Sequence, residues 1–283
     1  MELKKYIEKN IDKIIVWRRQ LHSFPELAFK EIETSNFVAE KLNSFGIKTY
    51  RGLGKTGIVG VLQSGTKQNN IGLRADMDAL PILEKNHFAH KSKNSGCMHA
   101  CGHDGHTAML LGAAEFLSKS KAFDGTVFFI FQPAEEGEAG ARAMIDDGLF
   151  SKFNIDSIFA IHNWPHLNPG IIKTRKGAIM AGFDTFELTV NGNGGHAALP
   201  HLSNDTITTS ASIILNWQTI VSRNIDPIDS VVLSVTKIIG GNAWAVIPKT
   251  VSLSGTVRTF SRNNQQYVKK RMLEIANSIA TSN

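Results

Sequence analysis

The chain has 283 residues, 42% of them hydrophobic and 20% charged, which is an ordinary globular composition with material for one large and one smaller domain. Its 31 basic and 25 acidic residues give a net charge of +6 but are mixed along the chain, which argues against a nucleic-acid-binding protein. No apolar run approaches the roughly 18 residues of a membrane span, and the first residues are charged throughout, so we expect a soluble, cytoplasmic protein without membrane contact.

Helical and strand patterns alternate over residues 1–180. Apolar residues at helical spacing predict helices at residues 3–21, 31–45 and 107–118. Short apolar runs predict strands at residues 58–62, 71–75, 126–131 and 158–161. This alternation is typical of an α/β domain built on a mixed, mostly parallel sheet.

A different pattern covers residues 181–283. It predicts strand, helix, strand, strand and helix, at residues 185–190, 205–223, 231–239, 250–259 and 264–279. That order is the ferredoxin-like β-α-β-β-α-β unit without its last strand. We therefore expect an inserted, incomplete α+β domain of the ferredoxin-like type after the first domain.

Acidic residues or a histidine directly follow three of the predicted strands. Asp76 and Asp78 come after the second strand, Glu135 and Glu136 after the third, and His162 after the fourth. In open α/β sheets, ligands bind beyond the carboxyl ends of the strands, so we expect these side chains to converge on one site.

A fourth segment, residues 98–106, concentrates a thiol, three imidazoles and a carboxylate just before a predicted helix. Cys97 and Cys101 are four residues apart here, which favours a metal-binding or reactive role in a reducing compartment over a disulfide. Thiolate and imidazole suit zinc, manganese or nickel better than magnesium or calcium. A single histidine is more often structural, but a joint pattern of this kind favours a metal site because buried charges are costly unless paired or coordinated. In the Glu135–Glu136 pair, one carboxylate can bind metal while the other takes a proton from water.

Six ordered motifs give the chain a specific family resemblance over nearly its whole length. It resembles the dinuclear metallopeptidase and aminoacylase family, in the amidohydrolase branch that includes hippurate hydrolase and N-acyl-amino-acid amidohydrolases. The motifs are LRADMDALP (73–81), MHACGHDGHTAMLLGAA (98–114), QPAEEGEAGARAMIDDGLF (132–150), IHNWPHLNPG (161–170), GGHAALPH (194–201) and GTVRTF (255–260).

The resemblance implies a role for each residue of the metal centre. Cys101 is expected to bridge two metal ions as a thiolate, and His103 and His162 to complete one metal site. Glu136 is expected to bind the second metal, and Glu135 to act as the general base. The implied ions are two divalent metals per subunit, manganese or zinc, with nickel or cobalt as alternatives.

The resemblance also implies three supporting residues. Asp78 matches a carboxylate that orients a metal ligand. His196 is expected to reach the active site of a partner subunit and stabilise the oxyanion, which makes the second domain a lid and a dimerisation domain of a homodimer. Arg258 is a candidate to pair with the carboxylate of the substrate.

The implied reaction is hydrolysis of N-acyl amino acids, such as hippurate and N-acetyl amino acids, by metal-activated water. Three alternatives stay open: a dipeptidase or N-acetyldiaminopimelate deacetylase of the same family, an inactive metal-binding relative, and a nucleic-acid binder. The family takes its last metal ligand from a histidine in a C-terminal segment, and the sequence ends at Asn283 before any such residue. From this we expect a C-terminally truncated chain with impaired metal loading.

Overall fold

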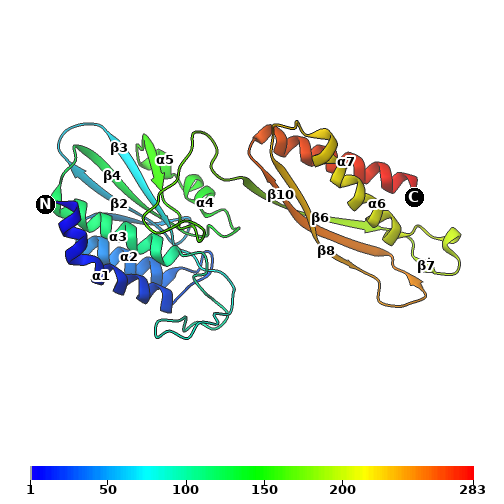
Figure 1. Ribbon diagram of the computed structural model, residues 1–283, viewed down its shortest axis with the longest axis horizontal. Helices are drawn as coiled ribbons and strands as arrows, with labels where there is room; N and C mark the ends of the chain where they lie inside the picture. Colours follow the sequence, from blue (N-terminus) through cyan, green and yellow to red (C-terminus); the bar gives the residue numbers. More distant parts are fainter. Residues whose placement is uncertain (1) are drawn as a thin grey trace. The chain divides into compact units, whose positions relative to one another are not determined.

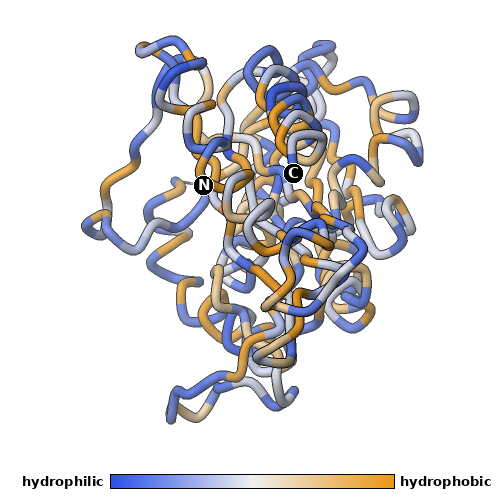
Figure 2. Tube along the Cα trace, turned by 90° about the vertical axis from the view of Figure 1, so that its right-hand side faces the viewer, coloured by the Kyte–Doolittle hydropathy of each residue, from blue (hydrophilic) through white to orange (hydrophobic). Residues whose placement is uncertain are grey.

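The computed structural model describes residues 2–283, which form two compact units that divide between Asn168 and Pro169. The sequence placed the division later, after residue 180, within a largely exposed segment. In Figure 2, hydrophobic and hydrophilic stretches of the trace alternate over short distances. Within residues 2–283, no helix combines the length and the apolar character needed to cross a membrane.

The first unit is an α/β domain with a five-stranded sheet in the order β1-β2-β4-β3-β5 (Figure 1). Strands β3, β4 and β5 are parallel, whereas β1 and β2 run antiparallel to their neighbours, so the sheet is mixed and only partly parallel. The prediction missed β1, α4 and α5. The elements are α1 (Leu3–Ser23), α2 (Ile32–Ser44), β1 (Lys48–Leu53), β2 (Gly57–Ser64), β3 (Asn70–Asp76), α3 (His103–Ser120), β4 (Gly125–Gln132), α4 (Gly140–Asp146), α5 (Leu149–Lys152) and β5 (Ser157–Ala160).

Strand β4 is the centre of the core because both of its faces are covered. Alternate side chains of a strand point to opposite faces of the sheet. Phe129 and Phe131 pack with α1, α2 and α3, which lie together on one face in Figure 1, while Phe128 and Ile130 pack with the short helices α4 and α5. A strand covered on both faces reads as a continuous apolar run, which is the sequence found at β4.

The parallel part of the sheet brings its polar strand ends together. Strands β4, β3 and β5 are neighbours, so their carboxyl ends lie at one edge of the sheet. The residues that follow these ends are the acidic pairs and His162 singled out above. The topology therefore supports the predicted convergence.

The second unit is a three-stranded antiparallel sheet, β6-β10-β8, with helices α6 and α7 packed against it. Trp217 of α6 is buried against α7 and donates its indole N–H to the carbonyl of Met272. The predicted order of strand, helix, strand, strand and helix is present, while the lid and dimerisation role of this unit stays a prediction. Its elements are β6 (Gly182–Asn191), β7 (Gly195–His196), a 3₁₀ turn (Pro200–Leu202), α6 (Thr206–Thr219), a π-helical turn (Ile220–Asn224), β8 (Val231–Gly240), β9 (Val246–Ile247), β10 (Thr250–Thr259) and α7 (Arg262–Ser282).

A buried charge cluster joins the end of α1 to the start of α3. His22 Nδ1 lies 2.8 Å from Asp104 Oδ2, and His22 Nε2 lies 3.1 Å from Glu84 Oε1. Arg18 adds a contact of 3.0 Å to the same Asp104 oxygen. The hydrogen bond to Asp104 raises the pKa of His22 above its ordinary 6.5, against the opposing effect of burial.

The raised pKa of His22 predicts a loss of stability at alkaline pH. A group whose pKa is higher in the folded than in the unfolded protein stabilises fully below its unfolded value, and this stabilisation is lost as the pH rises through the folded value. We expect the free energy of unfolding to decrease above pH 6.5 in the wild type, by about 1.5–3 kcal/mol for a hydrogen bond to a charged group. His22→Gln should make the decrease between pH 6 and pH 9 smaller in urea unfolding; an unchanged decrease would contradict the assignment.

Candidate metal centre

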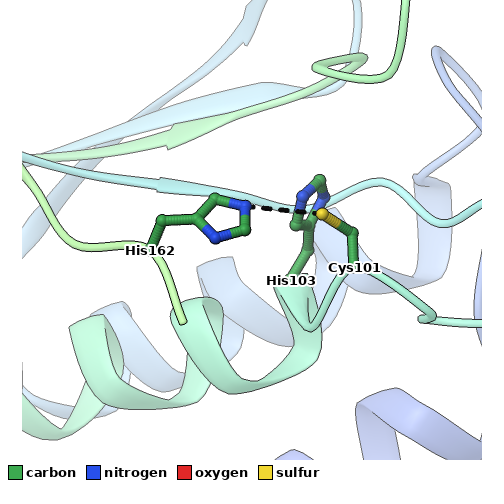
Figure 3. Close-up of side chains that lie close together, drawn as sticks. All are labelled: Cys101, His103 and His162. Atoms are coloured by element: carbon green, nitrogen blue, oxygen red, sulfur yellow. Dashed lines mark hydrogen bonds between the residues drawn. The ribbon is translucent and has the colours of Figure 1, made fainter. Parts of the chain in front are cut away.

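Three predicted ligands meet where α3 begins. The donor atoms of Cys101, His103 and His162 all lie within 4.8 Å of one another, and the Cys101 sulfur is 3.4 Å from Nε2 of His162 (Figure 3). Helix α3 begins at His103, four residues before the predicted start, so this imidazole lies in the first helical turn. Gly102 before it adopts a left-handed φ of 89°, and a Cβ there would lie 2.4 Å from the Asn163 side-chain oxygen. Only glycine allows the chain to enter the helix this close to the His162 loop.

The two adjacent glutamates approach the same imidazole from the end of β4. His103 Nε2 is 3.9 Å from Glu135 Oε2 and 3.9 Å from Glu136 Oε1. Within residues 2–283, both the His103 Nε2 atom and the Glu136 Oε1 atom are buried and lack a hydrogen-bond partner. Buried polar atoms without partners are costly, and a metal ion between these donors would satisfy both of them.

The electrostatic surroundings of His103 also favour a cation. Burial works against protonation of this ring, but its interactions with the side chains of Asp78 and Cys101 and the charge of Asp76 outweigh it and raise the pKa of His103 to about 11. Surroundings that stabilise a proton this strongly stabilise a divalent cation as well. The donor set of thiolate, imidazole and carboxylate fits a transition metal.

Asp78 forms hydrogen bonds with three residues of the candidate site. Its backbone carbonyl accepts the His103 Nδ1 hydrogen at 2.8 Å, which directs Nε2 toward the metal site. Its two carboxylate oxygens accept the backbone N–H groups of Glu135 and Glu136, each at 2.9 Å. Burial alone would raise the pKa of Asp78, but the hydrogen bonds from His103 and from these two amides lower it, so the side chain is a carboxylate.

Asp78→Asn should weaken metal binding and catalysis together. The amide group of asparagine has one acceptor oxygen, so its NH₂ group would face one of the two backbone N–H groups. We expect metal affinity or kcat/KM to fall by about 10 to 100-fold, as is usual for residues that orient metal ligands. Calorimetric titration with Mn²⁺ and steady-state kinetics would measure the two effects, and unchanged values in both would contradict this role.

His106 and Asp76 form a supporting pair that the sequence did not predict. His106 Nδ1 donates to Asp76 Oδ1 at 2.6 Å, and His106 Nε2 accepts the backbone N–H of Asn163 at 3.1 Å. This chain of hydrogen bonds fixes the backbone next to His162. Burial works to raise the pKa of Asp76, but the His106 hydrogen bond and the charge of Arg74 outweigh it and lower the pKa. Asp76 was expected near the site because it follows a predicted strand, whereas the only sequence signal for His106 was its position inside a motif.

Glu135 is the more exposed of the two glutamates. Its side chain is 40% exposed, against 24% for Glu136. Partial burial first, and the charge of Glu136 second, raise the pKa of Glu135 above its ordinary 4.5. A carboxylate with a raised pKa that reaches solvent is suited to accept a proton.

The remaining predicted residues, His196 and Arg258, belong to the second unit. His196 lies exposed on β7, and its Nδ1 accepts the backbone N–H of Ala198 at 3.1 Å. The Arg258 guanidinium stacks 3.9 Å above the ring of Phe183. Their participation in the site stays a prediction.

Comparison with known proteins decides the family. Residues 72–278 match Peptidase family M20/M25/M40. The chain belongs to this family. Among curated members, it is 44% identical over 266 residues to the hippurate hydrolase of Campylobacter jejuni, covering 94% of this chain and 69% of that protein. It is 42% identical over 280 residues to the N-acyl-L-amino acid amidohydrolase of Geobacillus stearothermophilus, covering 98% of this chain and 75% of the relative.

One further curated relative and two solved structures are also similar to the chain. The N-acetyl-L-cysteine deacetylase of Bacillus subtilis is 43% identical, and the chain spans 64% of its length. The structure of the Bacillus subtilis YXEP protein, a dinuclear metal binding peptidase from the M20 family, superposes with a TM-score of 0.81 at 36% identity, covering 97% of this chain and 71% of that one. A structure from methicillin-resistant Staphylococcus aureus gives a TM-score of 0.92 at 33% identity, covering 98% of this chain and 74% of that one. By family, the chain is therefore a metal-dependent amidohydrolase.

Proposed function

We propose that this chain hydrolyses the amide bond of N-acyl amino acids to a carboxylate and a free amino acid. The relatives named as a hippurate hydrolase, an N-acyl-L-amino acid amidohydrolase and an N-acetyl-L-cysteine deacetylase support this substrate class. The observation that carries the proposal is the convergence on one imidazole, His103, of Cys101, His162 and the two glutamates, with unpartnered buried donor atoms facing one another.

Cys101, His103, Glu136 and His162 would hold two divalent metal ions, manganese or zinc, with nickel or cobalt as alternatives. When bound, the two ions supply an activated water and polarise the amide carbonyl. The thiolate of Cys101 must remain reduced to bind metal, which is consistent with a cytoplasmic enzyme.

Glu135 would move the proton during the reaction. Its carboxylate takes a proton from the attacking water and returns it to the nitrogen of the leaving amine, so the amine departs uncharged. Asp78 keeps Glu135 in place through the backbone N–H, and it keeps His103 in one tautomer through the carbonyl.

Two residues of the second unit would complete the site in a homodimer. His196 is proposed to donate a hydrogen bond to the oxyanion in the active site of the partner subunit. Arg258 is proposed to bind the substrate carboxylate, because stacking on Phe183 occupies the face of the guanidinium and leaves its N–H edges for a bidentate contact.

The test is a substrate profile of the protein loaded with Mn²⁺ or Zn²⁺. We expect turnover of hippurate and N-acetyl amino acids, followed by release of the free amino acid. A preference for dipeptides or for N-acetyldiaminopimelate would overturn the substrate class. Stoichiometric metal binding without hydrolysis of any of these compounds would instead indicate a non-catalytic metal-binding relative.

A further inference from the structure

We propose that Glu31, at the start of α2, is a positioning residue for the two glutamates of the metal centre. The inference deepens the proposed function and rests on it where it speaks of catalysis. Glu31 lies 104 residues before Glu135 in the sequence, yet its carboxylate contacts the loop that carries Glu135 and Glu136.

The Glu31 carboxylate is fully buried and receives three hydrogen bonds. Oε1 accepts the backbone N–H of Ala134 at 2.8 Å and that of Phe29 at 3.1 Å, and Oε2 accepts the Thr56 hydroxyl at 2.6 Å. Burial raises the pKa of Glu31, and these donors oppose that effect. A buried carboxylate is unfavourable unless it is fully hydrogen-bonded, so its presence at this position indicates a specific use.

Two of the three hydrogen bonds come from residues with left-handed backbone, and the third comes from the residue that follows one. Five residues other than glycine have a positive φ within residues 2–283, and three of them lie at these contacts: Phe29 (60°), Lys55 (70°) and Ala134 (51°). Phe29 and Ala134 donate their own N–H groups to Glu31, and Lys55 immediately precedes Thr56. Residues with a Cβ rarely adopt this left-handed conformation, and it persists only where the surroundings enforce it.

The strain at Ala134 lies directly beside the reacting groups. Ala134 is followed by Glu135 and Glu136, so the left-handed turn sets the direction in which both side chains leave the backbone. The N–H groups of these three consecutive residues all end on buried carboxylate oxygens, the first on Glu31 and the next two on Asp78. Together the Glu31 and Asp78 carboxylates fix the backbone of this loop.

Ala134 is also held from its carbonyl side. Its oxygen accepts the N–H of Gly140 at 2.9 Å, and a Cβ on Gly140 would lie 1.8 Å from the carbonyl oxygen of Pro133. The close approach of Gly140 to Pro133 is therefore possible only for glycine. The N–H of Ala134, in contrast, depends on the buried Glu31 carboxylate as its acceptor. Loss of the acceptor leaves Ala134 able to relax to a negative φ, and such a rotation would turn Glu135 and Glu136 away from His103.

The experiment compares two substitutions of similar size. Glu31→Gln keeps an oxygen for the two backbone N–H groups, and its NH₂ group can donate to the Thr56 oxygen, whose hydrogen rotates away. Glu31→Met keeps the volume but removes every acceptor. Val38→Ala on the same helix α2 is the control for lost stability, because Val38 is fully buried in the core of the first unit.

The readouts are hydrogen exchange of the 133–137 segment by mass spectrometry, Mn²⁺ affinity, and kcat/KM on hippurate. We expect Glu31→Met to expose this segment to fast exchange and to lower metal affinity or kcat/KM by about 10 to 100-fold. Glu31→Gln should stay within about threefold of the wild type, since a neutral acceptor satisfies the same donors. Val38→Ala should lower the melting temperature while leaving the exchange of the segment and the metal affinity unchanged.

A second substitution tests the left-handed turn itself. Glycine adopts a positive φ as readily as a negative one, so Ala134→Gly should recover part of the Glu31→Met loss. The inference would be overturned if residues 133–137 of Glu31→Met exchanged hydrogen as slowly as in the wild type. It would also be overturned if the effects of Glu31→Met and Ala134→Gly on metal affinity and kcat/KM were strictly additive. If the wild type hydrolyses no N-acyl amino acid, the proposed function fails, while hydrogen exchange and metal affinity still decide the role of Glu31.

Discussion

Replacement of Glu135 by glutamine is expected to lower kcat/KM by about 10² to 10⁴-fold, the usual contribution of a positioned general base. Glutamine has nearly the same shape and retains the backbone N–H that Asp78 binds, so the loop should keep its conformation. It cannot accept a proton from water. Metal content, measured by atomic emission, should stay at the wild-type level because Glu135 is proposed as the base and not as a ligand.

The pH dependence of kcat/KM gives a second readout for the same residue. A base is active when deprotonated, so the rate should fall as the pH drops through the pKa of Glu135. Without metal, partial burial and the charge of Glu136 raise that pKa above its ordinary 4.5, while bound divalent cations act in the opposite direction, so the midpoint of the acidic limb measures the balance of these effects. In Glu135→Gln, the residual activity should lack this limb.

Glu138→Gln is the matched control for Glu135→Gln. Glu138 lies on the same loop, is exposed, and is three residues beyond Glu135. Its substitution removes one negative charge close to the site without touching the proposed base, so kcat/KM should change by less than about threefold. Equal losses in the two variants would assign the effect to the charge of the loop and would remove Glu135 from its role as the base.

Much of the metal centre was predictable because its residues follow strands that the apolar pattern reveals. Strands β3, β4 and β5 were each expected from a short apolar run, and their parallel arrangement brings Asp78, Glu135 and His162 to one edge of the sheet. The donor-rich segment before α3 was singled out by its ligand chemistry, the family resemblance selected Cys101 and His103 within it, and the structure brings both close to His162.

The supporting contacts were not predictable, because they join segments that are distant in sequence. Glu31 reads as an ordinary acid at a helix start, and nothing near it points to Ala134, 103 residues later. His106 received no role from the sequence, because its link to Asp76 depends on how α3 lies against β3. The predicted start of α3 was four residues late. Gly102 and Gly105 disfavour a helix in the sequence pattern, although the first turn of α3 carries His103 of the candidate site.

Replacement of Cys101 by alanine is expected to abolish loading of the two-metal site. Its thiolate is proposed to help hold the ions, so its loss would remove an anionic donor and leave His103 and His162 with too few ligands. Metal content should fall well below that of the unsubstituted protein measured in parallel, and kcat/KM should fall by more than about 10²-fold, since metal activation contributes several kcal/mol. In the Co²⁺-substituted protein, the sulfur-to-cobalt charge-transfer absorption should disappear.

Two further variants, Cys97→Ala and Cys101→Asp, test whether the effect of Cys101→Ala comes from the lost metal donor or from altered packing. Cys97 is buried, burial raises the pKa of its thiol, and it belongs to no group of potential metal donors within residues 2–283. Cys97→Ala should therefore leave metal content and the charge-transfer absorption intact. Cys101→Asp restores an anionic donor at this position, and a carboxylate suits Mn²⁺ better than a thiolate does. We expect it to recover metal binding more fully with Mn²⁺ than with Zn²⁺. An undiminished metal content in Cys101→Ala would instead remove Cys101 from the set of metal ligands.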